Sequence, residues 1–242
     1  MPFAVLPTNS WDVEAIAEVN IAAFEYALGI SHTLPRNLSN GLRKQLENTE
    51  RNIYTVKCVD TDTDRIVGVA SWQILWDSQK NEKKSKCQKN LEGLIEIRED
   101  AFGGRKHVYL SSLTVHPDYR REQIREFLLE WGIDIADELE LPLYVETLEN
   151  TASFYESMGL EKVTDHAVRF AANDIRTNID VEIPIFVKMP SIAEGLSFED
   201  WVFEGYPMNY EILKSDDQRN VSDFEGETED DTESEDDGGD GE

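Results

Sequence analysis

Hydrophobic and polar residues follow one another in blocks that predict alternating strands and helices. Residues 3–7 form a short apolar strand, and Ser10 is the predicted N-cap of the helix that follows. The residues expected on the inward side of that helix are spaced as in a helix, at Val13, Ile16, Ala17, Val19, Asn20 and Phe24. A second helix is expected around 37–48, after Pro35. The amino-terminal part is thus a strand followed by two helices.

Two β-rich runs come next, at 53–59 and 66–76. The polar link DTDTDR between them predicts an antiparallel hairpin. Residues 77–106 are polar and hold five lysines between Lys80 and Lys89, so a partly helical surface excursion is expected there.

The segment 107–160 predicts strand 107–115, a basic turn, a helix, strand 143–147 and a helix from Asn150 to Gly159. The first of these helices has one apolar stripe, made of Ile124, Phe127, Leu128, Trp131, Ile135 and Leu139. One or two strands follow, the last at 181–189. Hairpin and crossover connections together predict an α/β fold of α+β type, a mixed sheet with helices on both faces.

Charge is unevenly distributed along the 242 residues, whose net charge is −27. Residues 215–242 contain fourteen Asp and Glu against the single Arg219, with one aromatic residue. Such a segment cannot bury enough apolar surface to fold. We therefore expect one domain over 1–214 and a disordered acidic tail over 215–242. The tail is either a solubilising extension or a docking arm for a basic protein partner.

Composition also excludes several classes of protein. An acidic body argues against nucleic acid or an anionic membrane surface as a partner, because phosphate contacts need clustered Lys and Arg. No apolar run approaches the length of a membrane span, and the amino terminus lacks the pattern of a secretory signal. The two cysteines, Cys58 and Cys87, are expected to be free thiols in a reducing compartment. The sequence thus favours a cytoplasmic protein, with the nucleus left open, and the four histidines show no metal spacing.

The run HVYLSSLTVHPDYRREQIREFLLEWGIDIADELELPLYVETLENTASFYESMGL, residues 107–160, resembles the cofactor-binding half of the GNAT superfamily of acyl-CoA N-acyltransferases. The resemblance is sharp over 107–160, extends in element order over 3–190, and is greatest to a fungal subgroup. It implies a GNAT-like fold with acetyl-CoA as co-substrate. It also implies that the backbone of the strand at 110–115, at Leu113 and Val115, meets the pantetheine arm.

The family binds the cofactor pyrophosphate with Arg or Gln, two spacers, Gly, a spacer, then Gly or Ala. The matching positions are Arg120, Arg121, Glu122, Gln123, Ile124 and Arg125. The leading Arg is present, but both small positions are lost. Glycine lets an anion approach the N–H groups of a helix start, so the bulk of Gln123 and Arg125 and the charge of Glu122 oppose phosphate binding. The guanidinium groups and the Gln123 amide are the alternative phosphate ligands.

The resemblance also assigns catalytic roles. Tyr155 stands where the family protonates the departing CoA sulfur, and Asn150 where it contacts the pantetheine arm. The alternatives are a core tyrosine and a turn or N-cap asparagine. The strand at 107–115 offers Ser111 and Ser112 where relatives have a carboxylate. Glu146 is the remaining candidate for the general base, against the interpretation of a solvent-facing strand residue.

Two functions follow from these patterns. The first is an N-acetyltransferase that moves an acetyl group from acetyl-CoA to a primary amine by direct transfer in a ternary complex. The second is a catalytically inactive GNAT-fold binding or scaffold protein. The lost glycines favour the second, whereas Arg120, Asn150, Tyr155 and Gly159 in their places favour the first. The acceptor is expected near 28–40 and 170–182, and Trp201, Phe203 and Tyr206 are expected to pack on the sheet edge.

Overall fold

The structure, a computed structural model, describes residues 2–28, 43, 53–75, 98–170, 181–193 and 195–207, with no side chains described for 164–170 and 181–182. The chain divides into two units, Met1–Tyr206 and Pro207–Glu242, and every element below belongs to the first. The predicted helix at 37–48 (apart from Arg43), the Lys80–Lys89 cluster and the acidic segment 215–242 lie outside the described residues. The division at 214 therefore stays a prediction.

The described strands form one seven-stranded sheet in the order β1-β2-β3-β4-β5-β7-β6. Only β4 and β5 pair in parallel, and the other neighbours are antiparallel. The strands are β1 (Phe3–Pro7), β2 (Ile53–Asp60), β3 (Arg65–Leu75), β4 (His107–Val115), β5 (Leu143–Glu146), β6 (Glu161–Phe170) and β7 (Val181–Lys188). The predicted mixed sheet and hairpin are confirmed, and two strands, β6 and β7, are present where one or two were expected.

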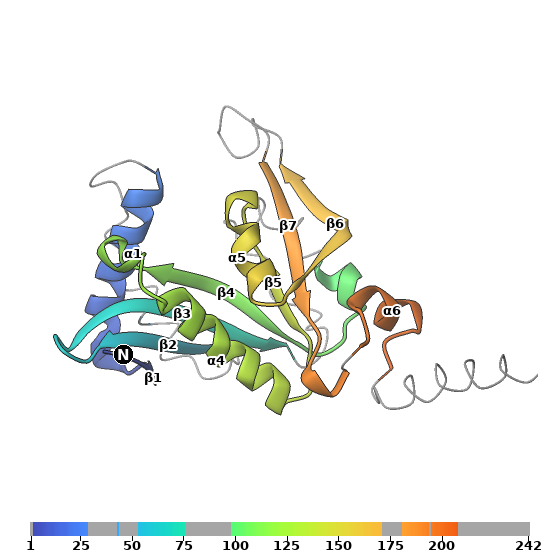
Figure 1. Cartoon of the computed structure of the whole chain (residues 1–242), viewed down its shortest axis with the longest axis horizontal. Helices are drawn as coiled ribbons and strands as arrows, with labels where there is room; N and C mark the ends of the chain where they lie inside the picture. The colour runs from blue at the N-terminus through green and yellow to red at the C-terminus, as the bar shows by residue number, and fades with distance from the viewer. Residues whose placement is uncertain are drawn as a thin grey trace, which may run out of the picture. The chain divides into compact units, whose positions relative to one another are not determined.

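Helices cover both faces of the sheet, as predicted (Figure 1). On β3, Val69 packs with Ile16 and Val19 of α1 (Val13–Leu28). The next residue, Ala70, belongs to the core that α4 (Ile124–Glu138) covers. Successive side chains of a strand point to opposite faces, so α1 and α4 lie on opposite sides of the sheet.

Two glycines let α4 lie close against β3. A Cβ on Gly132 would come within 2.2 Å of the Trp72 ring, and one on Gly68 within 2.6 Å of Ile124. The buried residues of α4 are Ile124, Leu128, Leu129, Gly132 and Ala136. The predicted stripe was therefore right at Ile124 and Leu128, and Trp131 and Leu139 pack, partly buried, against the same core. The stripe missed Leu129, Gly132 and Ala136, because the helix also presents small residues to the Trp72 ring.

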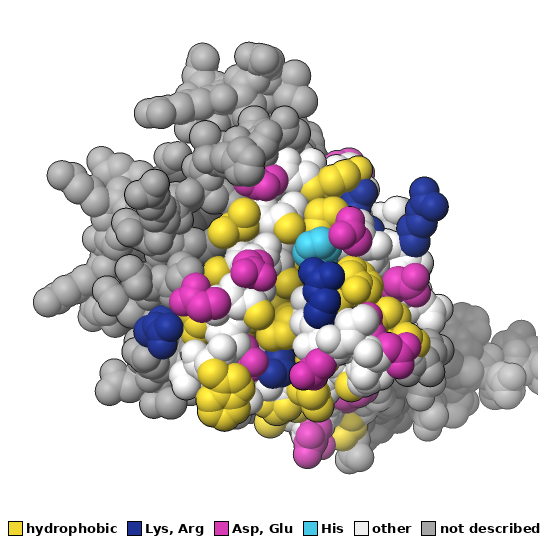
Figure 2. Space-filling view, turned by 90° about the vertical axis from the view of Figure 1, so that its left-hand side faces the viewer, with side chains coloured by type: hydrophobic (Ala, Val, Ile, Leu, Met, Phe, Trp, Pro, Cys, Tyr) yellow, Lys and Arg dark blue, Asp and Glu magenta, His cyan; other side chains and the backbone are white. Residues whose placement is uncertain are grey.

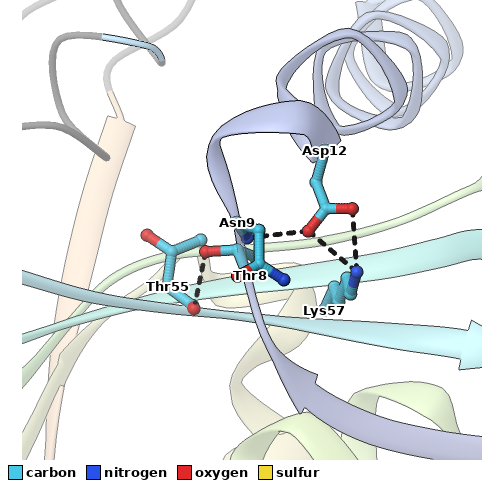
Figure 3. Close-up of polar contacts among 5 residues, drawn as sticks. All are labelled: Thr8, Asn9, Asp12, Thr55 and Lys57. Carbon is cyan, nitrogen blue, oxygen red and sulfur yellow. Dashed lines mark hydrogen bonds and ion pairs between the residues drawn. The ribbon is translucent and has the colours of Figure 1, made fainter.

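The start of α1 differs from the prediction by one residue. Asn9, with extended backbone, is the N-cap of the 3-10 turn η1 (Ser10–Asp12), so Ser10 lies inside the turn and is not the cap. Asp12 accepts a 2.7 Å hydrogen bond from the Asn9 N–H and two of 2.8 Å from Lys57 Nζ on β2 (Figure 3). Asp12 is 6% exposed, so this ion pair is buried and fixes α1 on the sheet.

The predicted surface excursion is partly helical, as expected, but two of its residues, Ala101 and Phe102, are buried. Residues 98–102 are helical, and Phe102 is fully buried between His107, Tyr144 and α6 (Phe198–Phe203). The aromatic cluster continues through Trp201 and Tyr206, whose hydroxyl donates to the Ala101 carbonyl. Trp201 and Tyr206 therefore pack as expected.

Phe203 does not follow that prediction, since it is 87% exposed.

Candidate functional site

The two parallel strands of the sheet separate after a short contact. Their pairing covers Val108 to Leu110 against Leu143 to Val145. Beyond it, Glu146 pairs with β7, while β4 continues to Val115 paired only with β3 among the described strands. Figure 1 shows the two strands diverging. The side of β4 at 111–115 that faces the divergence therefore offers backbone groups that no described strand uses.

A bulge lies on β4 at the start of this free edge. Ser71 is opposite Ser112 and Trp72 is opposite Leu110, so Ser111 is an extra residue. Ser111 and Ser112 are exposed, and the Ser111 hydroxyl donates to the Ser71 carbonyl at 2.9 Å. A bulge frees backbone groups from the ladder at the point where the strands part.

Leu113 and Val115 follow the bulge on the face of α4. Leu113 packs against the core, and Val115 is 7% exposed within it. Their side chains are thus structural, which leaves only their backbone for the predicted contact with the pantetheine arm.

The turn after β4 carries two exposed arginines, Arg120 and Arg121. His116 Nδ1 accepts from the Asp118 N–H, so His116 belongs to the turn. Arg120 is exposed, with its guanidinium 3.4 Å from the centre of the Tyr26 ring on α1 and its Nε donating to the Pro117 carbonyl. Arg121 is also exposed.

The start of α4 is a potential anion site that side chains partly fill. Gln123 is the exposed N-cap and makes no side-chain capping bond. The first N–H groups of a helix have no intrahelical acceptor. Ile124 is fully buried, so only its backbone is available to a ligand. Arg125 extends toward α5 (Ala152–Ser157), with its guanidinium 4.4 Å from the centre of the Phe154 ring.

Tyr155 lies on α5 and packs against β7, the strand next to β5. It is 7% exposed and packs on Phe186 at 5.9 Å and Phe154 at 5.0 Å. Burial raises the pKa of Tyr155, against smaller lowering effects of a hydrogen bond with Thr147 and the charge of Arg125. The phenol therefore stays protonated at neutral pH, the state that a proton donor needs.

The ends of α5 differ in how well they were predicted. Gly159, at φ +77°, ends the segment as predicted, and its N–H donates to the Glu156 carbonyl. Asn150 is exposed within the 3-10 turn η4 (Glu149–Thr151), and the N-cap of α5 is Thr151. Asn150 is thus a turn residue and not the cap.

Glu146 is not a solvent-facing residue, and that interpretation was wrong. Its side chain is 9% exposed and accepts hydrogen bonds from the Tyr109 hydroxyl at 3.2 Å and the Tyr144 hydroxyl at 3.0 Å. Arg98 lies 3.8 Å from Glu146 Oε1 and 4.2 Å from the centre of the Tyr109 ring. Burial raises the pKa of Glu146, although Arg98 and the two tyrosines oppose this.

Sequence reasoning missed the three partners of Glu146. Tyr144 and Glu146 are two residues apart on one strand, so the period of two would have placed them on one face. Tyr109 is opposite Tyr144 in the parallel pairing. Arg98 gives no local signal, because its contact with Glu146 depends on the tertiary fold.

Further candidate features are limited by what the structure describes. The acceptor segments 28–40 and 170–182 lie largely outside the described residues, as do the lysines at 80–89. Within the described residues, no group of three or more His, Cys, Asp or Glu side chains is arranged to hold a metal ion, and no helix is long and apolar enough to cross a membrane. On the side shown in Figure 2, basic side chains are scattered among acidic ones.

Comparison with known proteins decides the family. A model of the Acetyltransferase (GNAT) family matches residues 31–160, more than half of the chain. The chain belongs to the GNAT family. The free edge of β4 and the start of α4 both lie inside the matched range, as do Glu146 and Tyr155.

A curated relative agrees with this GNAT assignment. "Probable acyltransferase SID5" of Ajellomyces capsulatus is 35% identical over 80 residues, which are 33% of this chain and 58% of that protein. The alignment thus spans little more than half the length of the relative.

Solved structures share the GNAT fold at low sequence identity. The mosquito arylalkylamine N-acetyltransferase like 5b is 18% identical with a TM-score of 0.55, covering 77% of this chain and 99% of its own. Arabidopsis thaliana NAA60, in complex with a bisubstrate analogue, is 15% identical with a TM-score of 0.51, covering 78% and 98%. The predicted fold class is confirmed.

Proposed function

We propose that this GNAT protein transfers an acetyl group from acetyl-CoA to a primary amine by direct attack in a ternary complex. The observation that best supports the proposal is the divergence of β4 from β5, which leaves the β4 backbone at 111–115 open to a ligand. The pantetheine arm would lie along this edge at Leu113 and Val115. Asn150, in the turn η4 that follows β5, would contact the arm from the opposite side.

Phosphate binding would fall to the start of α4 and the turn before it. The backbone from Gln123 to Arg125 supplies helix N–H groups and the positive end of the helix dipole. Arg120 and Arg121 are exposed beside it and supply charge. Arg120 would exchange its contact with the Tyr26 ring for a phosphate, a change that a flexible surface side chain can make at low cost.

Acetyl transfer needs an unprotonated amine, a polarised carbonyl and a proton for the leaving thiolate. Backbone N–H groups near the Ser111 bulge would polarise the thioester carbonyl. The amine nitrogen attacks that carbon, the carbon–sulfur bond breaks, and Tyr155 gives its proton to the sulfur. Glu146, with a raised pKa and a place on the opposite strand, would take the proton from the amine.

A second function is supported by a specific observation. The guanidinium of Arg125 stacks on Phe154, so it bridges α4 and α5 where the family has a small residue. If this bridge excludes the cofactor, the protein is a GNAT-fold binding or scaffold protein, with its acidic segment as an arm for a basic partner. The free, buried Cys58 suits the cytoplasm in either case.

Calorimetric titration of acetyl-CoA and CoA into the protein separates the two functions. The matched variants are the double substitution Gln123→Gly/Arg125→Gly and, as a surface control, Arg65→Met. Micromolar binding to the natural protein and the control, followed by acetylation within a panel of amines, is the expected result.

The contrary result would be no binding to the natural protein, with binding restored in the double variant. It would identify a closed cofactor site and replace the enzyme proposal with the binding protein.

A further inference from the structure

Arg98 occupies a constrained place beside the candidate base. It is the first described residue of the helical segment 98–102, and its side chain is 15% exposed. The Tyr109 ring supports one face of the guanidinium at 4.2 Å, and Glu146 Oε1 lies 3.8 Å away. These contacts fix the position and orientation of a positive charge next to β4.

The contacts that the described residues make with Arg98 do not engage all of its hydrogen-bond donors. A guanidinium has five N–H donors, whereas Glu146 lies beyond hydrogen-bond distance. Both Glu146 oxygens already accept from tyrosines. Arg98 also makes a side-chain hydrogen bond with the Tyr109 hydroxyl.

Part of the Arg98 side chain reaches solvent, since that side chain is 15% exposed. A planar, half-neutralised guanidinium that is held by packing and still accessible has the geometry of a receptor for a carboxylate, which it can bind through two parallel hydrogen bonds.

The position of Arg98 relates it to the reacting centre. Gln73 is opposite Tyr109 and Ser71 is opposite Ser112, so Tyr109 and Ser112 lie on the same face of the sheet. This face is the one that α1 covers, because the Ser112 neighbour Thr114 donates to Asn20 of α1 at 2.6 Å. Tyr109 precedes the bulge by two residues, roughly 7 Å of strand. An acceptor whose amine reaches the bulge can therefore place a second group at Arg98.

We propose that the acyl acceptor is a small amine that also carries a carboxylate, and that Arg98 is the specificity-determining residue that binds this carboxylate. The inference rests on the proposed acyltransferase function and adds the substrate class. Glu146 and Arg98 offer opposite charges side by side, which match an ammonium and a carboxylate of one zwitterion. A diamine of equal length has no partner for Arg98 and meets its positive charge instead.

A purely structural role for Arg98 is the competing explanation. In that case Arg98 only neutralises Glu146, and the protein would not distinguish an amine with a carboxylate from one without. Ligand pairs that differ in this single group therefore test the proposal without requiring any substitution.

The experiment is calorimetric titration of the CoA-saturated protein with lysine against cadaverine and with 4-aminobutyrate against butylamine. We expect the carboxylated member of at least one pair to bind ~10-fold or more tightly, by the usual worth of charge-assisted hydrogen bonds. Arg98→Lys keeps the positive charge but loses the planar guanidinium that can form two parallel hydrogen bonds. In this variant the preference for the carboxylated ligand should shrink several-fold. Arg105→Lys, at an exposed arginine, should leave it unchanged.

Equal binding within both pairs, absence of binding by all four compounds, or an unchanged preference in Arg98→Lys would overturn the proposal. Titration of CoA alone is recorded separately on the same protein. If CoA fails to bind, the titrations are repeated without it. If CoA does not bind but the preference for the carboxylated ligands persists, the acyltransferase proposal is refuted and the anion site stands. If CoA binds normally and the preference is missing, only the anion site is refuted.

Discussion

Replacing Tyr155 by Phe removes one hydroxyl and separates catalysis from packing. The ring keeps its contacts with Phe186 at 5.9 Å and Phe154 at 5.0 Å, so no cavity forms. The lost hydrogen bond with Thr147 is neutral, and it contributes about 1 kcal/mol to the free energy of unfolding. Thr147 also keeps its hydrogen bond with the Thr151 hydroxyl, so it is not left unpaired.

The effect of Tyr155→Phe on rate should be much larger than its effect on stability. A positioned general acid contributes roughly 10²- to 10⁴-fold, which is about 2.7–5.4 kcal/mol of activation free energy. We therefore expect kcat to fall at least ~100-fold with little change in the affinity for acetyl-CoA. Because burial raises the pKa of Tyr155 above its ordinary value, the natural protein should keep its proton donor throughout the neutral pH range.

The assay should follow the acetylated amine by mass. Tyr54→Phe, at a tyrosine 47% exposed on β2, is the matched control and should keep full activity. Activity of Tyr155→Phe within ~3-fold of the natural protein, with acetyl-CoA still bound, would refute the role of proton donor. Loss of both folding and binding would assign Tyr155 to the core.

Three further predictions concern stability, each measured by urea unfolding. Gly132→Ala should destabilise by about 1–3 kcal/mol, despite the better helix propensity of Ala, because its Cβ meets the Trp72 ring at 2.2 Å; a more stable variant would contradict this packing. Burial lowers the pKa of His107 from 6.5 to about 4, so as the pH falls the unfolded chain binds a proton at His107 before the folded protein does. The free energy of unfolding should therefore be full above pH 6.5 and fall by about 3 kcal/mol toward pH 4. His107→Phe should flatten that slope. Lys57→Met should cost about 3–5 kcal/mol by leaving Asp12 charged and buried, whereas Lys57→Met with Asp12→Leu should recover much of it; equal losses would argue against a buried pair.

Much of the fold was predictable because it follows local periodicity. The hairpin of β2 and β3, the strand β4 and the helix α4 each have a repeating pattern within a single segment. The error on α4 has a physical cause. Hydrophobicity identifies large apolar residues, but the contact of α4 with β3 requires small ones, so Gly132 and Ala136 were not recognised as buried.

The candidate site was less predictable than the fold. The candidate positions along 107–160 followed from a family pattern, and the role of Tyr155, which is buried, stays a prediction. The environment of Glu146 could not be inferred, since Arg98 approaches it from a segment 48 residues earlier in the chain (146 − 98). Charged pairs formed by tertiary folding leave no periodic trace in either partner segment.

The strand order near the divergence has a consequence for synthesis of the protein. β7 lies between β5 and β6, although it follows both in the chain. Until Lys188 has left the ribosome, β5 has no partner on that side, and β6 has no place in the sheet. A nascent chain ending before β7 thus exposes an unpaired strand edge, to which another chain can pair. The half of the molecule that contains Glu146 should therefore fold after β7 is made, however early β1 to β4 assemble.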